Sequence, residues 1–150
     1  MQESQEVREA VELFYERLSA GDVEGTAGTI SVDEGSFVIG TQNIGTGRSA
    51  WLDSVQETAT YGIAFEGGAI RGFAEGEMGW AVDEPTIVLP DGARLTTRMT
   101  AVLRRGTTAY CVSCISTTPG RCPTRSGCRA STPGGSNSVS APPPDRSRGG

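Results

Sequence analysis

The chain has 150 residues, enough for one domain with a hydrophobic core of its own. Its 18 acidic and 13 basic residues give a net charge of −5, which argues against nucleic acid or an anionic membrane as a partner. No apolar run is long enough to cross a membrane, and the first residues are acidic where a signal peptide would be basic, so we expect a cytoplasmic protein. Every basic residue is an arginine, a bias typical of a GC-rich bacterial genome.

The first half of the chain predicts three helices and one short strand. Apolar residues recur at three- and four-residue spacing in the helical segments, and Asp22 and Ser49 are placed to cap the second and third helices. The helices are expected over residues 5–19, 23–30 and 50–58, and the strand over residues 35–40.

The second half predicts strands. Two strand regions cover residues 63–73 and 77–88, and the Gly-Gly pair at 67–68 marks a bulge or bend in the first. Pro-Asp-Gly at 90–92 predicts a tight turn into a long, strictly alternating strand over residues 93–105. Helices followed by an antiparallel meander predict an α+β fold.

Alternation gives the long strand two unlike faces. One face is apolar and should pack against helices, whereas the other carries Arg98, Thr100 and Val102 and suits the wall of a semi-polar pocket. Arg98 and Thr100 are chemically suited to hold an oxyanion or a carboxylate. An ordinary half-buried strand, with its Arg/Thr face in solvent, fits the same pattern.

Four stretches of the chain resemble the nuclear transport factor 2-like (NTF2-like) superfamily, which includes ketosteroid isomerase and the SnoaL-like polyketide cyclases. They are similar to its first helix, the loop opening its third helix, its hairpin and its long fourth strand, and lie at residues 11–22, 45–51, 91–92 and 98–105. The resemblance implies a cone-shaped α+β barrel of N-terminal helices on a curved antiparallel sheet. It also implies a pocket for a small apolar or polyketide-like ligand, and a homodimer.

The catalytic residues of ketosteroid isomerase are not matched. The resemblance places its catalytic tyrosine at Phe14, its base near Ile39 or Gly40, and its protonated acid at Thr100. Steroid isomerisation by that mechanism is therefore not expected. An isomerase, cyclase or hydrolase of unassigned reaction and a non-catalytic ligand-binding or dimerisation module both stay open.

The candidate pocket residues combine aromatic side chains with the polar pair of the long strand. They are Phe14, Tyr15, Phe37, Trp51, Tyr61, Trp80, Arg98 and Thr100. Core packing is the simpler interpretation of each aromatic. The acidic residues Glu57, Glu66, Glu75, Glu77 and Asp83 are expected on solvated faces rather than as bases. Residues 1–105 contain no phosphate-binding loop, metal-ligand spacing or nucleophile–base pair, so no cofactor is expected.

The sequence changes character after Arg105. Only one of the 18 acidic residues lies beyond it, whereas all four cysteines and six of the eight prolines do. Cys111, Cys114, Cys122 and Cys128 lack the two tight pairs of a zinc site, and no histidine is available, so we predict neither a metal site nor a disulfide framework. We predict one domain over residues 1–118 and a disordered, low-complexity tail over 119–150.

The family places a closing strand after the long fourth strand, and this part of the chain departs from the family pattern. Degenerate codons for residues 106–116, read in a shifted frame, permit a turn followed by an alternating strand. We therefore hypothesise that the coding sequence slipped frame near Arg105, with a natural disordered tail as the alternative. If the closing strand is lost, the long strand becomes an open edge and the protein should be marginally stable or self-associating.

Overall fold

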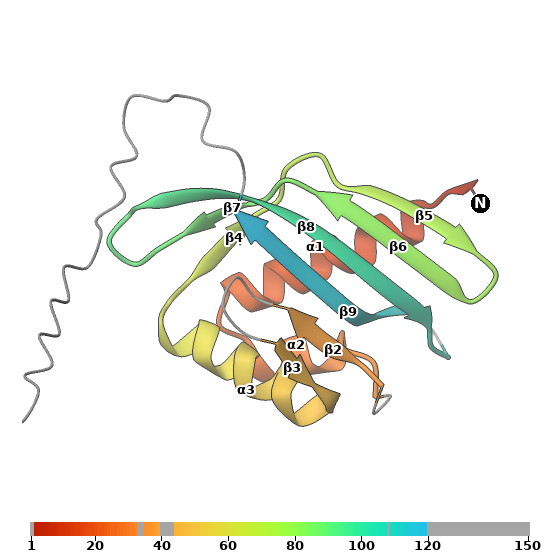
Figure 1. Ribbon diagram of the computed structural model, residues 1–150, viewed down its shortest axis with the longest axis horizontal. Coiled ribbons are helices and arrows are strands. Elements are labelled where there is room, and N and C mark those ends of the chain that lie inside the picture. The colour runs from red at the N-terminus through yellow and green to blue at the C-terminus, as the bar shows by residue number, and fades with distance from the viewer. Residues whose placement is uncertain (1, 33–34, 40–43, 108, 120–150) are drawn as a thin grey trace, which may run out of the picture.

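The computed structural model describes residues 2–32, 35–39, 44–107 and 109–119. Three helices lie against one face of a strongly curved sheet (Figure 1). The helices are α1 (Gln5–Ser19), α2 (Val23–Gly28) and α3 (Gly47–Thr60). The strands are β1 (Gln2–Glu3), β2 (Phe37–Ile39), β3 (Ile44–Thr46), β4 (Ala64–Glu66), β5 (Arg71–Glu75), β6 (Met78–Asp83), β7 (Thr86–Val88), β8 (Arg94–Arg105) and β9 (Tyr110–Pro119).

The sheet is mixed rather than purely antiparallel. Its main order is β1-β5-β6-β8-β9-β2-β3, and β7 pairs with the first part of β8 while β4 pairs with β7. All of these pairs are antiparallel except β2–β9, which is parallel. Within the described strands, β1 and β3 end the main path without pairing to each other, so the α+β fold is a curved open sheet and not a closed barrel.

Helix α1 has the predicted bounds and packs directly on β5 and β6 (Figure 1). The Ser4 hydroxyl accepts a hydrogen bond from the Val7 N–H at 3.3 Å and so caps the first turn. Close approach to β5 depends on Gly72, because a Cβ there would lie 2.7 Å from the Ser4 carbonyl oxygen and 2.8 Å from the Arg8 nitrogen. The face of α1 toward the sheet buries Val7, Val11, Phe14, Tyr15 and Leu18.

The helix caps follow the sequence at one site and depart from it at another. Asp22 accepts from the Gly25 N–H at 2.8 Å and caps α2, as predicted. Helix α3 begins at Gly47, two residues before Ser49, so the predicted Ser49 cap is wrong. The reason is the unpredicted strand β3, which runs directly into the helix, with the Gly47 N–H donating to the Ser36 carbonyl at 2.7 Å.

Each of the two predicted strand regions divides into two strands. Residues 63–73 become β4 and β5, and residues 77–88 become β6 and β7. The division follows from the long strand β8, which has different partners along its length. Its first part pairs with β7, which pairs with β4, whereas its second part pairs with β6, which pairs with β5. Gly68 lies where the two halves meet, and a Cβ on it would be 2.7 Å from the Glu84 carbonyl oxygen.

Strand β8 shows the predicted alternation. Its inner face buries Thr97, Met99, Ala101 and Leu103 against the helical side of the sheet. Its outer face carries Arg98, Thr100 and Arg104, which are exposed. The apolar face therefore packs as expected from Thr97 onward, whereas Leu95, on the same face, is 50% exposed.

The closing strand that the sequence left in doubt is present as β9. It pairs antiparallel with β8 from Thr97↔Pro119 to Arg105↔Tyr110, and with β2 on its other side. Leu103 is opposite Val112 and Val102 is opposite Cys114, so Ser113 is the extra residue of a β-bulge. The buried positions of β9 change from even to odd residue numbers at Ser113. The extra residue therefore lets Tyr110, Val112 and Ile115 all point inward, and all three are buried. Strand β8 is therefore not an open edge.

The predicted disordered tail, with Cys122 and Cys128, lies outside the described residues apart from Pro119, the last residue of β9. The frame-slip hypothesis likewise stays a prediction. The structure shows that residues 110–119 of the chain as given form a paired strand.

Candidate functional site

A cavity of about 660 Å³ lies between α1, α3 and the inner side of the sheet. Its wall is mainly aliphatic and aromatic, with a few polar side chains. It is lined by Phe14, Leu18, Val38, Ile39, Trp51, Ser54, Val55, Glu57, Thr58, Tyr61, Ile63, Phe65, Ile87, Ile115 and Thr117. A cavity of this size and composition suits a small, mostly apolar molecule.

Regular spacing brings these side chains together. Phe14 and Leu18 are four residues apart on α1, and Trp51 and Val55 are four apart on α3, so each pair lies on one face of its helix. The rings of Phe14 and Trp51 meet edge to face, with centroids 6.1 Å apart and an interplanar angle of 90°. This contact joins the two helices at the cavity wall.

Three of the eight candidate pocket residues line the cavity: Phe14, Trp51 and Tyr61. Tyr15 is buried next to it, where its ring stacks on Phe65 with centroids 5.8 Å apart. Phe37 lies on β2, beside two residues of the wall, but is itself 37% exposed. The other three candidates belong to the outer face of the sheet, away from the helices.

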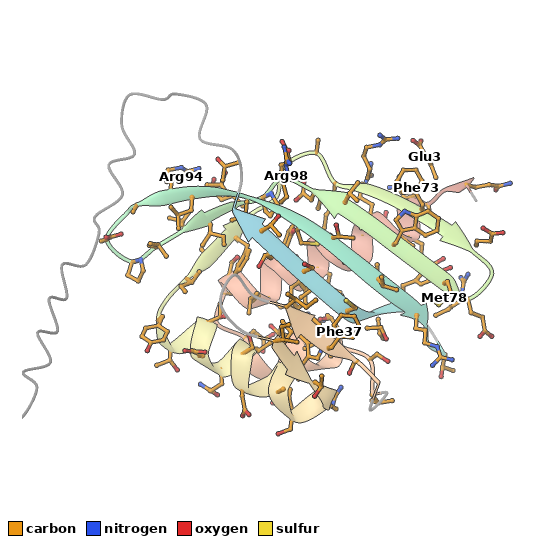
Figure 2. All side chains as sticks on the ribbon, viewed as in Figure 1. Glu3, Phe37, Phe73, Met78, Arg94 and Arg98 are labelled. Atoms are coloured by element: carbon orange, nitrogen blue, oxygen red, sulfur yellow. The ribbon has the colours of Figure 1, made fainter. Side chains whose placement is uncertain are left out.

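Arg98 and Thr100 form no wall of this cavity, since the cavity lies on the opposite face of β8. Thr100 is exposed opposite Val82. Arg98 (labelled in Figure 2) forms an exposed ion pair with Glu84 at 3.3 Å. Trp80 is also on this outer face, stacked on Phe73 with centroids 5.5 Å apart. The alternative of a solvated Arg/Thr face describes β8 correctly, because the helices cover the apolar side of the sheet.

The polar part of the cavity wall contains no basic side chain. Among the lining residues, Glu57 and Tyr61 are ionisable, and Ser54, Thr58 and Thr117 supply hydroxyls. Trp51 is 1% exposed, and its indole N–H has no hydrogen-bond partner in the described part of the chain. The N–H is thus an enclosed donor behind the cavity wall.

Asp83 is buried, so the predicted solvated position of this residue is wrong. It is 5% exposed and lies on the inner side of β6. Its Oδ2 accepts a hydrogen bond from the Gly68 N–H at 3.1 Å. The sequence held a signal for this, because an outward set of Met78, Trp80 and Val82 leaves Gly79, Ala81 and Asp83 facing inward.

Tyr15 and Asp83 interact electrostatically inside the core. Burial of the Tyr15 hydroxyl, and next the negative charge of Asp83, raise the pKa of Tyr15 well above its ordinary value. Neither Tyr15 Oη nor Asp83 Oδ1 has a hydrogen-bond partner of good geometry in the described residues. The two groups are close enough for a hydrogen bond between them to add to the shift, so the phenol stays protonated.

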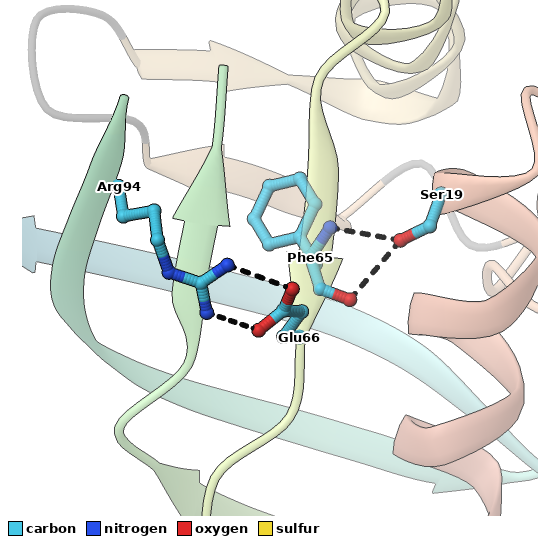
Figure 3. A network of polar contacts seen from close by, with 4 residues as sticks. All are labelled: Ser19, Phe65, Glu66 and Arg94. Carbon is cyan, nitrogen blue, oxygen red and sulfur yellow. Dashed lines mark hydrogen bonds and ion pairs between the residues drawn. The ribbon is translucent and has the colours of Figure 1, made fainter. Parts of the chain in front are cut away.

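Phe65, which lines the cavity and stacks on Tyr15, is held in place through its backbone. The Ser19 hydroxyl accepts from the Phe65 N–H at 2.8 Å and donates to the Phe65 carbonyl at 3.1 Å (Figure 3). On the next residue, Glu66 forms an exposed two-pronged ion pair with Arg94 (Figure 3). Hydrogen bonds from Arg94 lower the pKa of Glu66. Strand β4 is thus fixed to both α1 and β8.

The geometry of Cys111 and Cys114 does not suit a shared zinc ion. Both lie on β9, opposite Arg104 and Val102. Three residues of extended strand separate their Cα atoms by about 10 Å, whereas two sulfurs on one zinc ion lie about 4 Å apart. Within the described residues, no group of three or more potential metal ligands is close enough to hold an ion.

The family follows from the sequence match. Residues 7–111 match the SnoaL-like domain family. The chain belongs to this family. The match confirms the resemblance noted above and extends six residues past Arg105, into β9. No curated protein matches the sequence.

Several solved structures, two of them described as NTF2-like, share the fold at low sequence identity. A proposed dehydratase of the NTF2-like family from Streptomyces avermitilis is 18% identical, with a TM-score of 0.71 over 79% of this chain and 96% of that one. An NTF2-like superfamily protein from Salmonella enterica is 14% identical, with a TM-score of 0.69 over 82% and 94%. A Nostoc punctiforme protein of unknown function with a cystatin-like fold is 13% identical, with a TM-score of 0.67 over 80% and 96%.

None of the helices in the described part of the chain has the length and apolar character needed to cross a membrane.

Proposed function

We propose that this SnoaL-like protein binds a small, mostly apolar, polyketide-like molecule in the cavity between α1, α3 and the sheet. The observation that carries the proposal is the cavity itself, about 660 Å³ of space lined mainly by aliphatic and aromatic side chains with a few hydroxyls. Buried apolar walls with few polar groups are typical of small-molecule sites.

The charge of the wall favours a neutral or cationic ligand. Glu57 is the one carboxyl group among the lining residues, and no lining residue is an arginine. A ligand carboxylate would therefore meet a like charge and no cation to pair with.

An isomerase, cyclase or hydrolase type of reaction is the enzymatic version of this proposal, and a non-catalytic binding module is the other. A dehydratase activity is proposed for the Streptomyces avermitilis relative, which supports the enzymatic version only through the shared fold. Ligand binding is common to both versions, so it is the property to test first.

Filling the cavity tests the proposal. Thr58→Trp places a large ring in the wall, whereas Thr60→Trp adds the same ring two residues later on the same helix, at a residue outside the wall. We expect the neutral dye Nile red to bind the wild type and Thr60→Trp with similar affinity, and to bind Thr58→Trp at least about tenfold more weakly. Equal binding to all three proteins, measured by dye fluorescence, would contradict the proposal.

A second proposal concerns the outer face of the sheet, for which we infer a homodimer interface. A row of side chains from five strands crosses this face in register, consisting of Phe37, Cys114, Val102, Trp80 and Phe73. Exposed apolar side chains flank or end the row, with Met78 46% and Val82 39% exposed. Phe37, Phe73 and Met78 are labelled in Figure 2. Apolar surface gathered on one face favours association.

An arginine substitution on the outer face, with a matched control elsewhere, tests the dimer. Val82 on the outer face and Leu13 on α1 are each 39% exposed. Val82→Arg should give a monomer in size-exclusion chromatography with light scattering, while Leu13→Arg and the wild type stay dimeric. A monomeric wild type at high concentration would refute the interface.

A further inference from the structure

Helix α3 carries an acidic side chain at the end where a helix favours a basic one. Glu57 lies in the last turn of α3, and the free carbonyl groups at that end of a helix give it a partial negative charge. Helix α1 has Arg17 in its last turn, whereas the last turn of α3 has no basic residue. Asp53, one turn earlier on the same side of α3, adds a like charge. The position of Glu57 therefore lowers the stability of the helix.

The rest of the described chain does not compensate for this charge. The Glu57 side chain is exposed, and its carboxylate has neither a hydrogen bond nor an ion pair within the described residues. Glu57 nevertheless lines the cavity, so it lies at the opening where the apolar space meets solvent. A local rule that is broken at a cavity, without a compensating contact in the fold, indicates a function for the residue.

The residues around Glu57 suit a positive charge. Tyr61 follows at a spacing of four residues, also lines the cavity and is 60% exposed, so a cation can approach its ring. Thr58, another residue of the wall, donates its hydroxyl proton to the Ser54 carbonyl at 2.8 Å, which leaves its oxygen as an acceptor. Because no described lining residue is basic, an ammonium group would meet acceptors and an aromatic ring here but no like charge.

We propose that the cavity takes an amine-bearing ligand, whose apolar body lies between α1, α3 and the sheet while its protonated amine pairs with the Glu57 carboxylate at the opening. The proposal rests on ligand binding in the cavity, as proposed above, and narrows the neutral or cationic ligand named there to a cationic one. The ammonium donates to Glu57 and Thr58 and faces the Tyr61 ring. An alcohol of the same shape would keep the apolar contacts and lose the charge pairing, and a carboxylate would be repelled by Glu57.

The experiment compares two ligands of the same shape on the full chain, at low salt and about pH 7, where an alkylamine is protonated. 1-Adamantanemethylamine carries an ammonium group where 1-adamantanemethanol carries a hydroxyl, and isothermal titration calorimetry measures both affinities. We expect the wild type to bind the amine about fivefold more tightly, the combined effect of an exposed ion pair and a cation–π contact. Glu57→Gln should reduce this preference to less than about twofold and leave the affinity for the alcohol unchanged. The same variant should melt about 1–3 °C higher than the wild type, because it removes an unfavourable charge from the end of α3.

Glu24→Gln is the matched control, because it removes the same charge from an exposed glutamate outside the cavity wall. Glu24 lies in the first turn of α2, where an acidic residue is favourable, so this variant should keep the amine preference and melt slightly lower than the wild type. A preference that survives in Glu57→Gln, or that falls equally in both variants, would overturn the proposal. Equal wild-type affinity for amine and alcohol would also overturn it, while leaving ligand binding in the cavity intact. Binding of neither ligand would refute both proposals.

Discussion

Tyr15 shows how strongly a buried environment changes the chemistry of one residue. Its folded-state pKa is raised, first by burial and then by Asp83, whereas the unfolded chain should titrate near pH 10. As the pH rises through that value the unfolded state loses the proton that the folded state keeps. Stability is therefore fully present below about pH 10 and falls above it.

We predict that the wild type loses about 1.4 kcal/mol more stability per pH unit above pH 10 than Tyr15→Phe does, because the variant has no proton to lose at this position. Urea unfolding at about pH 8 and about pH 11 measures the difference. A Tyr15→Phe variant with the same pH dependence as the wild type would show that Tyr15 is not shielded from ionisation. Sequence periodicity placed Tyr15 on the buried face of α1, but its neighbour Asp83 is a contact across 68 residues that no local pattern reports.

At the scale of elements, local signals predicted the helices better than the strands. The apolar spacing of α1 and the Asp22 cap of α2 are properties of neighbouring residues, so they could be read from the sequence. Strand β3 pairs with β2 just before it, in a short hairpin that the patterning did not reveal, whereas the division of β4 from β5 depends on β7 further along the chain. The bulge at Ser113 is of this second kind, because it exists only against β8.

The bulge gives a prediction at this scale. Deleting Ser113 removes the extra residue and leaves a regular ladder, in which Cys114 follows Val112 directly and Ile115 and Thr117 still face inward. We expect the free energy of unfolding to stay within about 1 kcal/mol of the wild type, because the same side chains stay buried. Ser113→Ala keeps the residue count and should stay within about 0.5 kcal/mol of the wild type by urea unfolding. A large loss of stability in the deletion variant, with Ser113→Ala unchanged, would mean that β9 is not held in this register.

At the scale of the whole molecule, the order of helices and strands and the α+β class were predictable from patterning and family resemblance. The position of the cavity was not. The sequence shows that β8 has two unlike faces, but which face meets the helices and the cavity depends on how the whole sheet curves around α1. For this reason the sequence suggests Arg98 and Thr100 as pocket residues, although they lie on the opposite face of the sheet from the cavity.

The whole-molecule prediction concerns where the folded chain can end. Strand β9 lies between β8 and β2 and buries Tyr110, Val112 and Ile115, so its loss would expose an inner strand and remove three core side chains. At about 1.5–3 kcal/mol each, these side chains represent about 5–9 kcal/mol, comparable with the total stability of a domain. A chain ending after Gly106 should therefore not fold, whereas one ending after Pro119 should melt within a few degrees of the full chain by circular dichroism. A stable domain ending at Gly106 would show that β9 is dispensable. A large loss of stability on ending at Pro119 would instead assign a structural role to residues 120–150, against the predicted disordered tail.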